Sequence, residues 1–231
     1  MSKLAATLDN ENIVHVRGTP ASGKTRLSEL LREHYRKEGR KVSLIKEWEK
    51  LDHNNPWDSL VKLVEKWNEE AQDAPTTTSQ SEQDLSWVLT SNTVIIVDEA
   101  QMTYNDAALW NTVFKERLTP NVYKFQLCLF CSYGSPAAGP DQTFFTPVKF
   151  SNEQRISLTP QNQQDSPPIG LFYDEEEFKD VVSRLLAFHY EERFNFDEGA
   201  LEYIFAVTNG HPGAVTSIVD VIYEVRAKSS L

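Results

Sequence analysis

The chain of 231 residues carries 34 acidic and 23 basic side chains, a net charge of −11, and 40% of its residues are apolar. This composition is that of a globular protein with one buried core and room for a small appended subdomain. No apolar run approaches the roughly 20 residues of a membrane span, and the first residues lack the apolar stretch of a secretory signal peptide. We therefore expect no membrane partner, and an intracellular location in the cytoplasm or nucleus.

The charge is unevenly distributed along the chain. Residues 1–50 hold 11 basic and 7 acidic side chains, whereas the remainder holds 12 basic and 27 acidic ones. An acidic body repels the phosphates of nucleic acids, which argues against direct nucleic-acid binding. The basic excess surrounds a glycine-rich stretch near residue 20, where a bound triphosphate would need it.

Hydrophobic patterning predicts five short strands that alternate with helices. The strands are expected at residues 12–16, 41–45, 93–97, 124–134 and 155–160. Such alternation is typical of parallel βαβ units, with helices on both faces of one sheet. The predicted fold class is therefore α/β, a three-layer arrangement around a parallel sheet.

The helix after the first strand shows the clearest periodicity. Leu27, Leu30, Leu31 and Tyr35 follow helical spacing and are expected to form its buried face, with Gly39 as the C-cap.

Residues 72–84 have no apolar periodicity and are interpreted as a mobile insertion in a core that spans residues 1–170. Only helices are expected after Asp174, which is a candidate N-cap, and a break at residues 209–213 separates the last two. Residues 171–231 are thus predicted to form a helical lid.

Residues 18–25, GTPASGKT, match the phosphate-loop pattern G-x-x-x-x-G-K-[ST] between a predicted strand and a predicted helix. The glycines allow a tight turn whose N–H groups point at phosphate oxygens, and the helix N-terminus adds partial positive charge. Lys24 is expected to reach the β- and γ-phosphates, and Thr25 to hold Mg²⁺. The predicted nucleotide-contacting residues are Gly18, Thr19, Pro20, Ala21, Ser22, Gly23, Lys24, Thr25 and Arg26.

Two acids follow the buried strand at residues 93–97. Asp98 is expected to hold Mg²⁺ or its water shell, and Glu99 to accept a proton from the water that attacks the γ-phosphate. Ser132, at the end of the fourth strand, is either a polar γ-phosphate sensor or a simple turn residue. Cys128 and Cys131 point to opposite faces of that strand, so we interpret them as core residues and not as a metal pair.

The adjacent Asp and Glu are typical of ATPases that insert an extra strand between the phosphate-loop strand and the acidic strand. In that division the fourth strand of this chain would lie between the first and the third. The expected strand order is therefore 5-1-4-3-2.

These motifs in this order resemble an AAA-type or STAND-type P-loop ATPase. The resemblance implies that Gly210-His211-Pro212 packs near the nucleotide base and ribose, with Pro212 as the contact. It also places Arg155 near the nucleotide or a neighbouring subunit. A plain helix break at residues 209–213 is the alternative.

More narrowly, VHVRGTPASGKTRLSELL, residues 14–31, resembles the N-terminal ATPase module of fungal Crinkler-type proteins. That resemblance implies an attached nuclease-like effector domain or a protein partner, and delivery to a host cell by a signal not seen here. The sequence shows neither an arginine finger nor a lid arginine for the γ-phosphate. A slow nucleotide switch therefore fits better than fast turnover in a ring.

The predicted function is binding of ATP with Mg²⁺ and slow hydrolysis to ADP and phosphate, as a switch for an effector. Lys24, Asp98, Glu99 and Ser132 are the candidate catalytic residues. The main alternative is a module that binds the nucleotide without cleaving it. A helicase half, suggested by the sequence DEAQ at residues 98–101, and a small-molecule P-loop kinase remain as further alternatives.

Overall fold

A computed structural model describes most of the chain. The described residues are 1–69, 88–90, 92–117, 124–132, 150–159, 169–189 and 195–229. The insertion predicted at residues 72–84 lies outside them. The chain forms two compact units, of which the first contains Met1–Gly18 and Lys24–Ser157 and the second contains Thr19–Gly23 and the chain from Gly170 onward. Five residues of the predicted phosphate loop thus group with the C-terminal helices.

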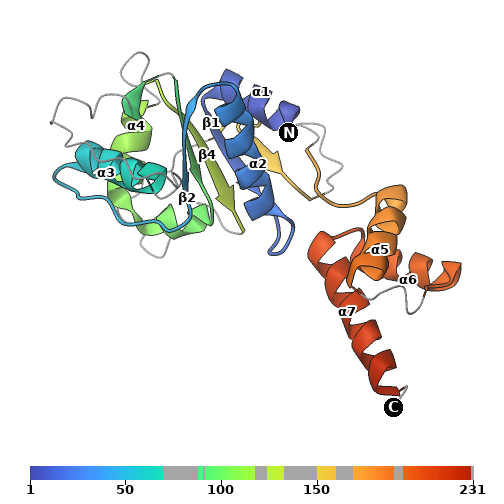
Figure 1. Cartoon of the computed structure of the whole chain (residues 1–231). Helices are drawn as coiled ribbons and strands as arrows, with labels where there is room; N and C mark the ends of the chain where they lie inside the picture. The colour runs from blue at the N-terminus through green and yellow to red at the C-terminus, as the bar shows by residue number, and fades with distance from the viewer. Residues whose placement is uncertain are drawn as a thin grey trace. The chain divides into compact units, whose positions relative to one another are not determined.

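The first unit is built on a five-stranded parallel sheet (Figure 1). The strands are β1 (Ile13–Arg17), β2 (Lys41–Ile45), β3 (Thr93–Val97), β4 (Gln126–Cys131) and β5 (Arg155–Ser157). Their order is β2-β3-β4-β1-β5, and every pair is parallel. This confirms the predicted α/β class and the predicted order 5-1-4-3-2.

Strands β3 and β4 lie in the middle of the sheet, and all of their residues are buried. Burial on both faces explains why their sequences are continuous apolar runs without alternation. Cys128 and Cys131 are free and buried in β4. Burial raises the pKa of the Cys131 thiol to about 12. Both cysteines therefore act as small core residues.

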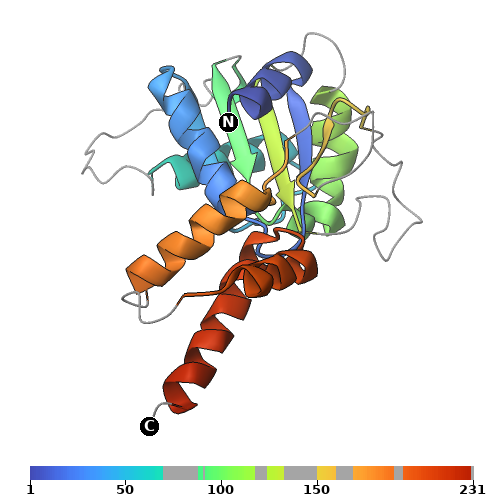
Figure 2. The ribbon, with the colours of Figure 1, turned by 90° about the vertical axis from the view of Figure 1, so that its right-hand side faces the viewer.

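Helices α1 (Ser2–Glu11) and α2 (Lys24–Lys37) lie on one side of the sheet (Figures 1 and 2). Leu27, Leu31 and Tyr35 of α2 are buried as predicted, but Leu30 is 37% exposed. The prediction for Leu30 was wrong because the buried stripe of this helix follows i, i+4 spacing. Helix α1, which buries three of its apolar side chains, was not predicted at all.

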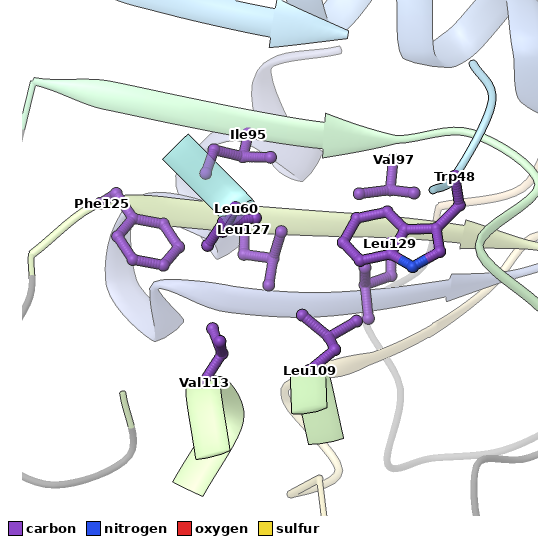
Figure 3. Close-up of a pocket in the computed structure, with 9 residues that line it drawn as sticks. All are labelled: Trp48, Leu60, Ile95, Val97, Leu109, Val113, Phe125, Leu127 and Leu129. Carbon is purple, nitrogen blue, oxygen red and sulfur yellow. The ribbon is translucent and has the colours of Figure 1, made fainter. Parts of the chain in front are cut away.

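The opposite face of the sheet is covered by α3 (Pro56–Glu69), η3 (Leu109–Val113) and α4 (Phe114–Arg117). The helical connection between β3 and β4 contains a 3₁₀ segment, η2 (Ala100–Asn105), and then a π-helical turn followed by a short α-helix. A small cavity of about 10 Å³ remains in this apolar layer (Figure 3). It is lined by Trp48, Leu60, Ile95, Val97, Leu109, Val113, Phe125, Leu127 and Leu129. Because no polar atom faces it, the cavity offers a water molecule no partner.

Asp106 anchors the loop after β2 to the start of η3. The residue is buried, and its Oδ2 accepts hydrogen bonds from Trp48 Nε1 and from the backbone N–H of Leu51, both at 2.9 Å. Its Oδ1 accepts the backbone N–H of Leu109 at 3.1 Å. A buried carboxylate with three donors holds two segments together through strong, charge-assisted bonds.

His15 lies in the middle of β1 and is 2% exposed. Its Nε2 is 3.3 Å from Tyr104 Oη and 3.1 Å from Cys131 Sγ, and its ring stacks on Phe150. Burial is the main cause that lowers its pKa to about 4, and the charges of Arg17 and Arg155 lower it further. His15 is therefore a neutral core residue at pH 7.

The second unit contains three helices, α5 (Glu175–His189), α6 (Glu198–Thr208) and α7 (Pro212–Ser229). The predicted cap at Asp174 is confirmed: its Oδ1 accepts the backbone N–H of Glu177, whose side chain accepts the backbone N–H of Asp174. The helices pack around a small apolar core. It consists of Phe178, Val182, Leu186, Ile204, Val215 and Val219. Among the described residues, no helix is long and apolar enough to cross a membrane.

Replacement of Asp106 by alanine is expected to destabilise the first unit by about 3 kcal/mol, because it leaves two buried backbone N–H groups without an acceptor. Urea unfolding measures the change. Asp52→Ala is the matched control, since Asp52 is exposed and accepts a single local N–H, from Asn54. A cost for Asp106→Ala equal to that of the control would contradict this account.

Acid is expected to destabilise the fold through His15. Its pKa is lower in the folded chain, about 4, than the ordinary 6.5 of an unfolded chain, so the unfolded state takes up the extra proton. Its contribution is fully present above pH 6.5 and falls as the pH drops toward 4, by about 2 kcal/mol at pH 5.

Urea unfolding at pH 7.5 and pH 5 tests this, with His15→Gln as the comparison because glutamine does not titrate. The loss of stability between the two pH values should be smaller in His15→Gln by that amount. Equal losses in the two proteins would show that His15 is not the responsible group.

Candidate functional site

The predicted phosphate loop joins the end of β1 to the start of α2. Gly18 donates its N–H to the carbonyl of Cys131 on β4 at 3.2 Å, which ties the start of the loop to the neighbouring strand. Ala21 and Gly23 have positive φ angles of 57° and 92°. Two left-handed residues within three positions give the tight turn that the glycine pattern predicted. The loop thus has the backbone curvature of a phosphate cradle.

Lys24 is buried at the carboxyl edge of the sheet, and its Nζ donates to the carbonyl of Gly18 at 3.2 Å. Burial lowers the pKa of Lys24, whereas the negative charges of Glu99 and Asp98 act in the opposite direction. The ammonium group is therefore in the field of both acids of the second motif. An ammonium group bonded to its own loop can exchange that bond for one to a phosphate oxygen.

Ser22 gives a direct test of whether the loop suits an anionic ligand. Its side chain is 1% exposed, and its Oγ has no hydrogen-bond partner among the described residues. A buried hydroxyl without a partner is costly, and such a group usually has a ligand or an ordered water. The Ser22 hydroxyl fits a phosphate group bound in the loop.

Strand β3 delivers the two acids to the same edge of the sheet. Asp98 is 5% exposed, and its backbone N–H donates to the carbonyl of Ile45 at 2.9 Å. Its Oδ1 accepts the backbone N–H of Glu99 at 3.1 Å. Glu99 has a φ of 48° and a ψ of 41°, a left-handed conformation that is uncommon for a residue with a side chain. Such strain is found most often at functional positions.

The carboxylate of Glu99 is held by two neighbours. Ser132 Oγ donates to Glu99 Oε2 at 3.1 Å, and Gln101 Nε2 donates to the same oxygen. Gln101 Oε1 in turn accepts the backbone N–H of Ser132 at 3.1 Å. Ser132 is therefore bonded to the predicted catalytic base and is more than a turn residue.

Gln101 was not among the predicted site residues. Its amide bridges β3 and β4 only because Glu99 turns the chain into the left-handed region and η2 follows. A polar residue two positions after the glutamate was the only available signal in the sequence.

Thr25 and Asp98 are the residues that would hold Mg²⁺. Thr25 is exposed at the start of α2, and Asp98 supplies a buried carboxylate. No group of three or more His, Cys, Asp or Glu side chains with metal-binding geometry occurs in the described part of the chain. This donor set fits Mg²⁺, which commonly binds through one or two protein oxygens and takes its remaining ligands from phosphates and water.

Within the second unit, loop residues 19–23 contact the first turn of α7. Thr19 Oγ1 lies 2.8 Å from His211 Nε2, and the N–H of Gly213 donates to the carbonyl of Ala21 at 3.2 Å. Pro212, the predicted base contact, is the first residue of α7. Its role at a nucleotide stays a prediction, although its two neighbours contact the loop.

The two predicted arginines have partners elsewhere. Arg26 forms an ion pair with Glu29 at 3.2 Å on the surface of α2. Arg155 donates from Nε and Nη2 to the carbonyl of Phe150, at 3.0 and 2.6 Å. These contacts give both side chains local roles, and their assignment to the nucleotide stays a prediction.

No protein-family model matches this chain, and neither does any curated protein. Among solved structures, it resembles DnaA from Aquifex aeolicus bound to AMPPCP, at 11% identity and a TM-score of 0.48, over 94% of this chain and 58% of that one. It also resembles a RuvB mutant of Thermotoga maritima, at 12% identity and a TM-score of 0.48, over 100% of this chain and 63% of that one.

A third similar structure is Drosophila ORC bound to DNA, at 15% identity and a TM-score of 0.44, over 94% of this chain and 56% of that one. The chain thus spans less than two thirds of the length of each of these proteins. Identities this low compare folds alone, and the strand order determined above defines the fold here.

Proposed function

We propose that this chain binds ATP with Mg²⁺ through the loop Gly18–Thr25 and hydrolyses it slowly to ADP and phosphate. The observation that carries the proposal is the grouping of Lys24, Asp98 and Glu99 at one edge of the sheet, with Glu99 bonded to Ser132. Parallel sheets bind their ligands at this edge, and the loop supplies the N–H groups and the ammonium that phosphates require.

Each residue has a separate task in this proposal. Lys24 exchanges its bond to the Gly18 carbonyl for bonds to the β- and γ-phosphates. Glu99 accepts the proton of the attacking water after Ser132 and Gln101, which bind its carboxylate in the ligand-free chain, have released it. Mg²⁺, held by Thr25 and Asp98, neutralises phosphate charge when it is bound.

Hydrolysis is expected to be slow because of the bonds at Glu99. Two donors occupy one carboxylate oxygen of Glu99, and while these bonds last that oxygen is not available to the attacking water. We infer that turnover requires a rearrangement of the hydrogen bonds among Glu99, Gln101 and Ser132. Such a requirement suits a regulatory switch. An attached or bound effector domain, of the nuclease-like kind that the Crinkler resemblance implies, is the proposed recipient of the signal.

The same bonds support a second candidate function, a module that binds ATP and does not cleave it. If Gln101 and Ser132 never release Glu99, no base is available and the nucleotide serves only as a structural ligand. Both functions use the loop and Lys24 to bind the nucleotide. They differ only in whether Glu99 accepts a proton from the attacking water.

Lys24→Ala is expected to weaken binding of Mg-ATP by about 10- to 100-fold, because a charge-assisted bond to phosphate contributes about 1.5–3 kcal/mol. Isothermal titration measures the affinity. Lys46→Ala is the matched control, since Lys46 is a surface lysine paired with Glu29. Equal affinities for the wild type and Lys24→Ala would contradict the assignment of this loop.

Glu99→Gln is expected to retain Mg-ATP binding and to lower phosphate release by about 10²- to 10⁴-fold, since the amide cannot accept the proton. Glu38→Gln is the control, since Glu38 is exposed in the turn that follows α2. Unchanged turnover in Glu99→Gln would show that Glu99 is not the base. A wild type that binds ATP but releases no phosphate would support the non-hydrolysing module.

A further inference from the structure

The first turn of α7 packs against the strained part of the phosphate loop. Ala21 has a left-handed conformation, with a φ of 57°, which costs a residue with a side chain about 1 kcal/mol or more. Such a conformation persists only when neighbouring groups hold it. Within the second unit those neighbours are His211 and Gly213, which lie about 190 positions later in the sequence.

Gly213 provides the closest approach. Its N–H donates to the carbonyl of Ala21 at 3.2 Å, and a side chain at this position would overlap the Cβ of Ala21. Gly213 lies in the first turn of a helix and has no positive φ, so the backbone conformation itself does not require glycine. Its small size is needed because the loop lies against it.

His211 provides a second link, and its tautomer follows from its two partners. The backbone N–H of Ala214 donates to His211 Nδ1 at 3.1 Å, so Nδ1 carries no proton. The ring proton of neutral His211 therefore lies on Nε2, which donates to Thr19 Oγ1 at 2.8 Å. One imidazole thus caps α7 and holds the loop at the same time.

We propose that His211 and Gly213 are positioning residues for nucleotide binding, which hold loop residues 19–23 in the curved conformation that receives the phosphates. They act on the loop backbone and do not touch the phosphates themselves. By this means the helical unit sets the affinity for the nucleotide through the loop. The inference rests on the proposed function for its ligand. The contacts of His211 and Gly213 with the loop, called the brace below, can be tested without any nucleotide.

The first test uses the ligand-free chain. Hydrogen exchange of the backbone amides at residues 19 and 21–23 is compared among the wild type, Thr19→Val, His211→Asn and Gly213→Ala. Asparagine is a good N-cap and keeps the bond to Ala214, but its shorter side chain does not reach Thr19. Faster exchange in all three variants is expected, and wild-type exchange rates in all of them would overturn the brace.

Gly199→Ala is the matched control for Gly213→Ala. Both glycines lie in the first turn of a lid helix, but a Cβ at Gly199 would be 3.5 Å from Asp197 Oδ1, an ordinary contact. Alanine favours a helix over glycine, so Gly199→Ala should leave loop exchange unchanged or slightly stabilise the chain. Equal effects of the two substitutions on the loop would overturn the role of Gly213.

The second test measures Mg-ATP affinity by isothermal titration. Thr19→Val and His211→Asn should each weaken binding by about 5-fold, and the double variant by no more than either alone, because both remove one bond. Gly213→Ala should weaken binding by more than 5-fold, and Gly199→Ala should not.

The possible failures can be told apart. A wild type that binds no Mg-ATP contradicts the proposed function, and the exchange experiment then decides the brace alone. A wild type that binds Mg-ATP, with affinities unchanged in Thr19→Val and His211→Asn, contradicts the positioning role and leaves the proposed function intact. A 25-fold loss in the double variant would show that the two side chains act independently.

Discussion

The candidate site depends on the position of β4 between β1 and β3. Because all three strands are parallel, their carboxyl ends meet at one edge of the sheet, and each ends in a residue of the site. Strand β1 leads into Gly18, β3 into Asp98 and β4 into Ser132. The bond from the Gly18 N–H to the Cys131 carbonyl fixes the first of these ends against the third. Without the inserted strand, Glu99 and Ser132 could not share a hydrogen bond.

Polar groups in this fold are buried where two segments must be held together. Asp106 does so for the loop after β2 and the start of η3, with three hydrogen bonds to one carboxylate. Glu99, which is half-buried, joins the ends of β3 and β4 in a similar way. Ser22 is the contrasting case, since its buried hydroxyl has no partner in the described part of the chain.

Much of this arrangement could be predicted because its signals are local. The succession of apolar runs predicted the strands, and the cap at Asp174 followed from its place at the start of a predicted helix. The strand order followed from the likeness of the adjacent Asp98 and Glu99 to ATPases with an inserted strand. Features that depend on tertiary contacts could not be predicted. Helix α1 has few apolar residues and is stabilised by packing on β1 and β4, and Leu30 has helical spacing but faces away from the sheet.

The same limit explains the two site features that sequence reasoning missed. Gln101 reaches Ser132 only because Glu99 adopts a left-handed conformation, and no pattern of residue types predicts that conformation. The bond between Thr19 and His211 joins residues 192 positions apart. The glycine-rich motif predicts that a phosphate loop exists, whereas the structure adds the contacts that hold its shape.

A crystal structure of Glu99→Gln with Mg-ATP would test the central claim most directly. The account predicts that the phosphates bind to backbone N–H groups within residues 21–25, and that Lys24 Nζ moves from the Gly18 carbonyl to a phosphate oxygen. Mg²⁺ should lie beside Thr25 and Asp98. A nucleotide bound elsewhere, or a Lys24 that keeps its bond to Gly18 with ATP present, would contradict it.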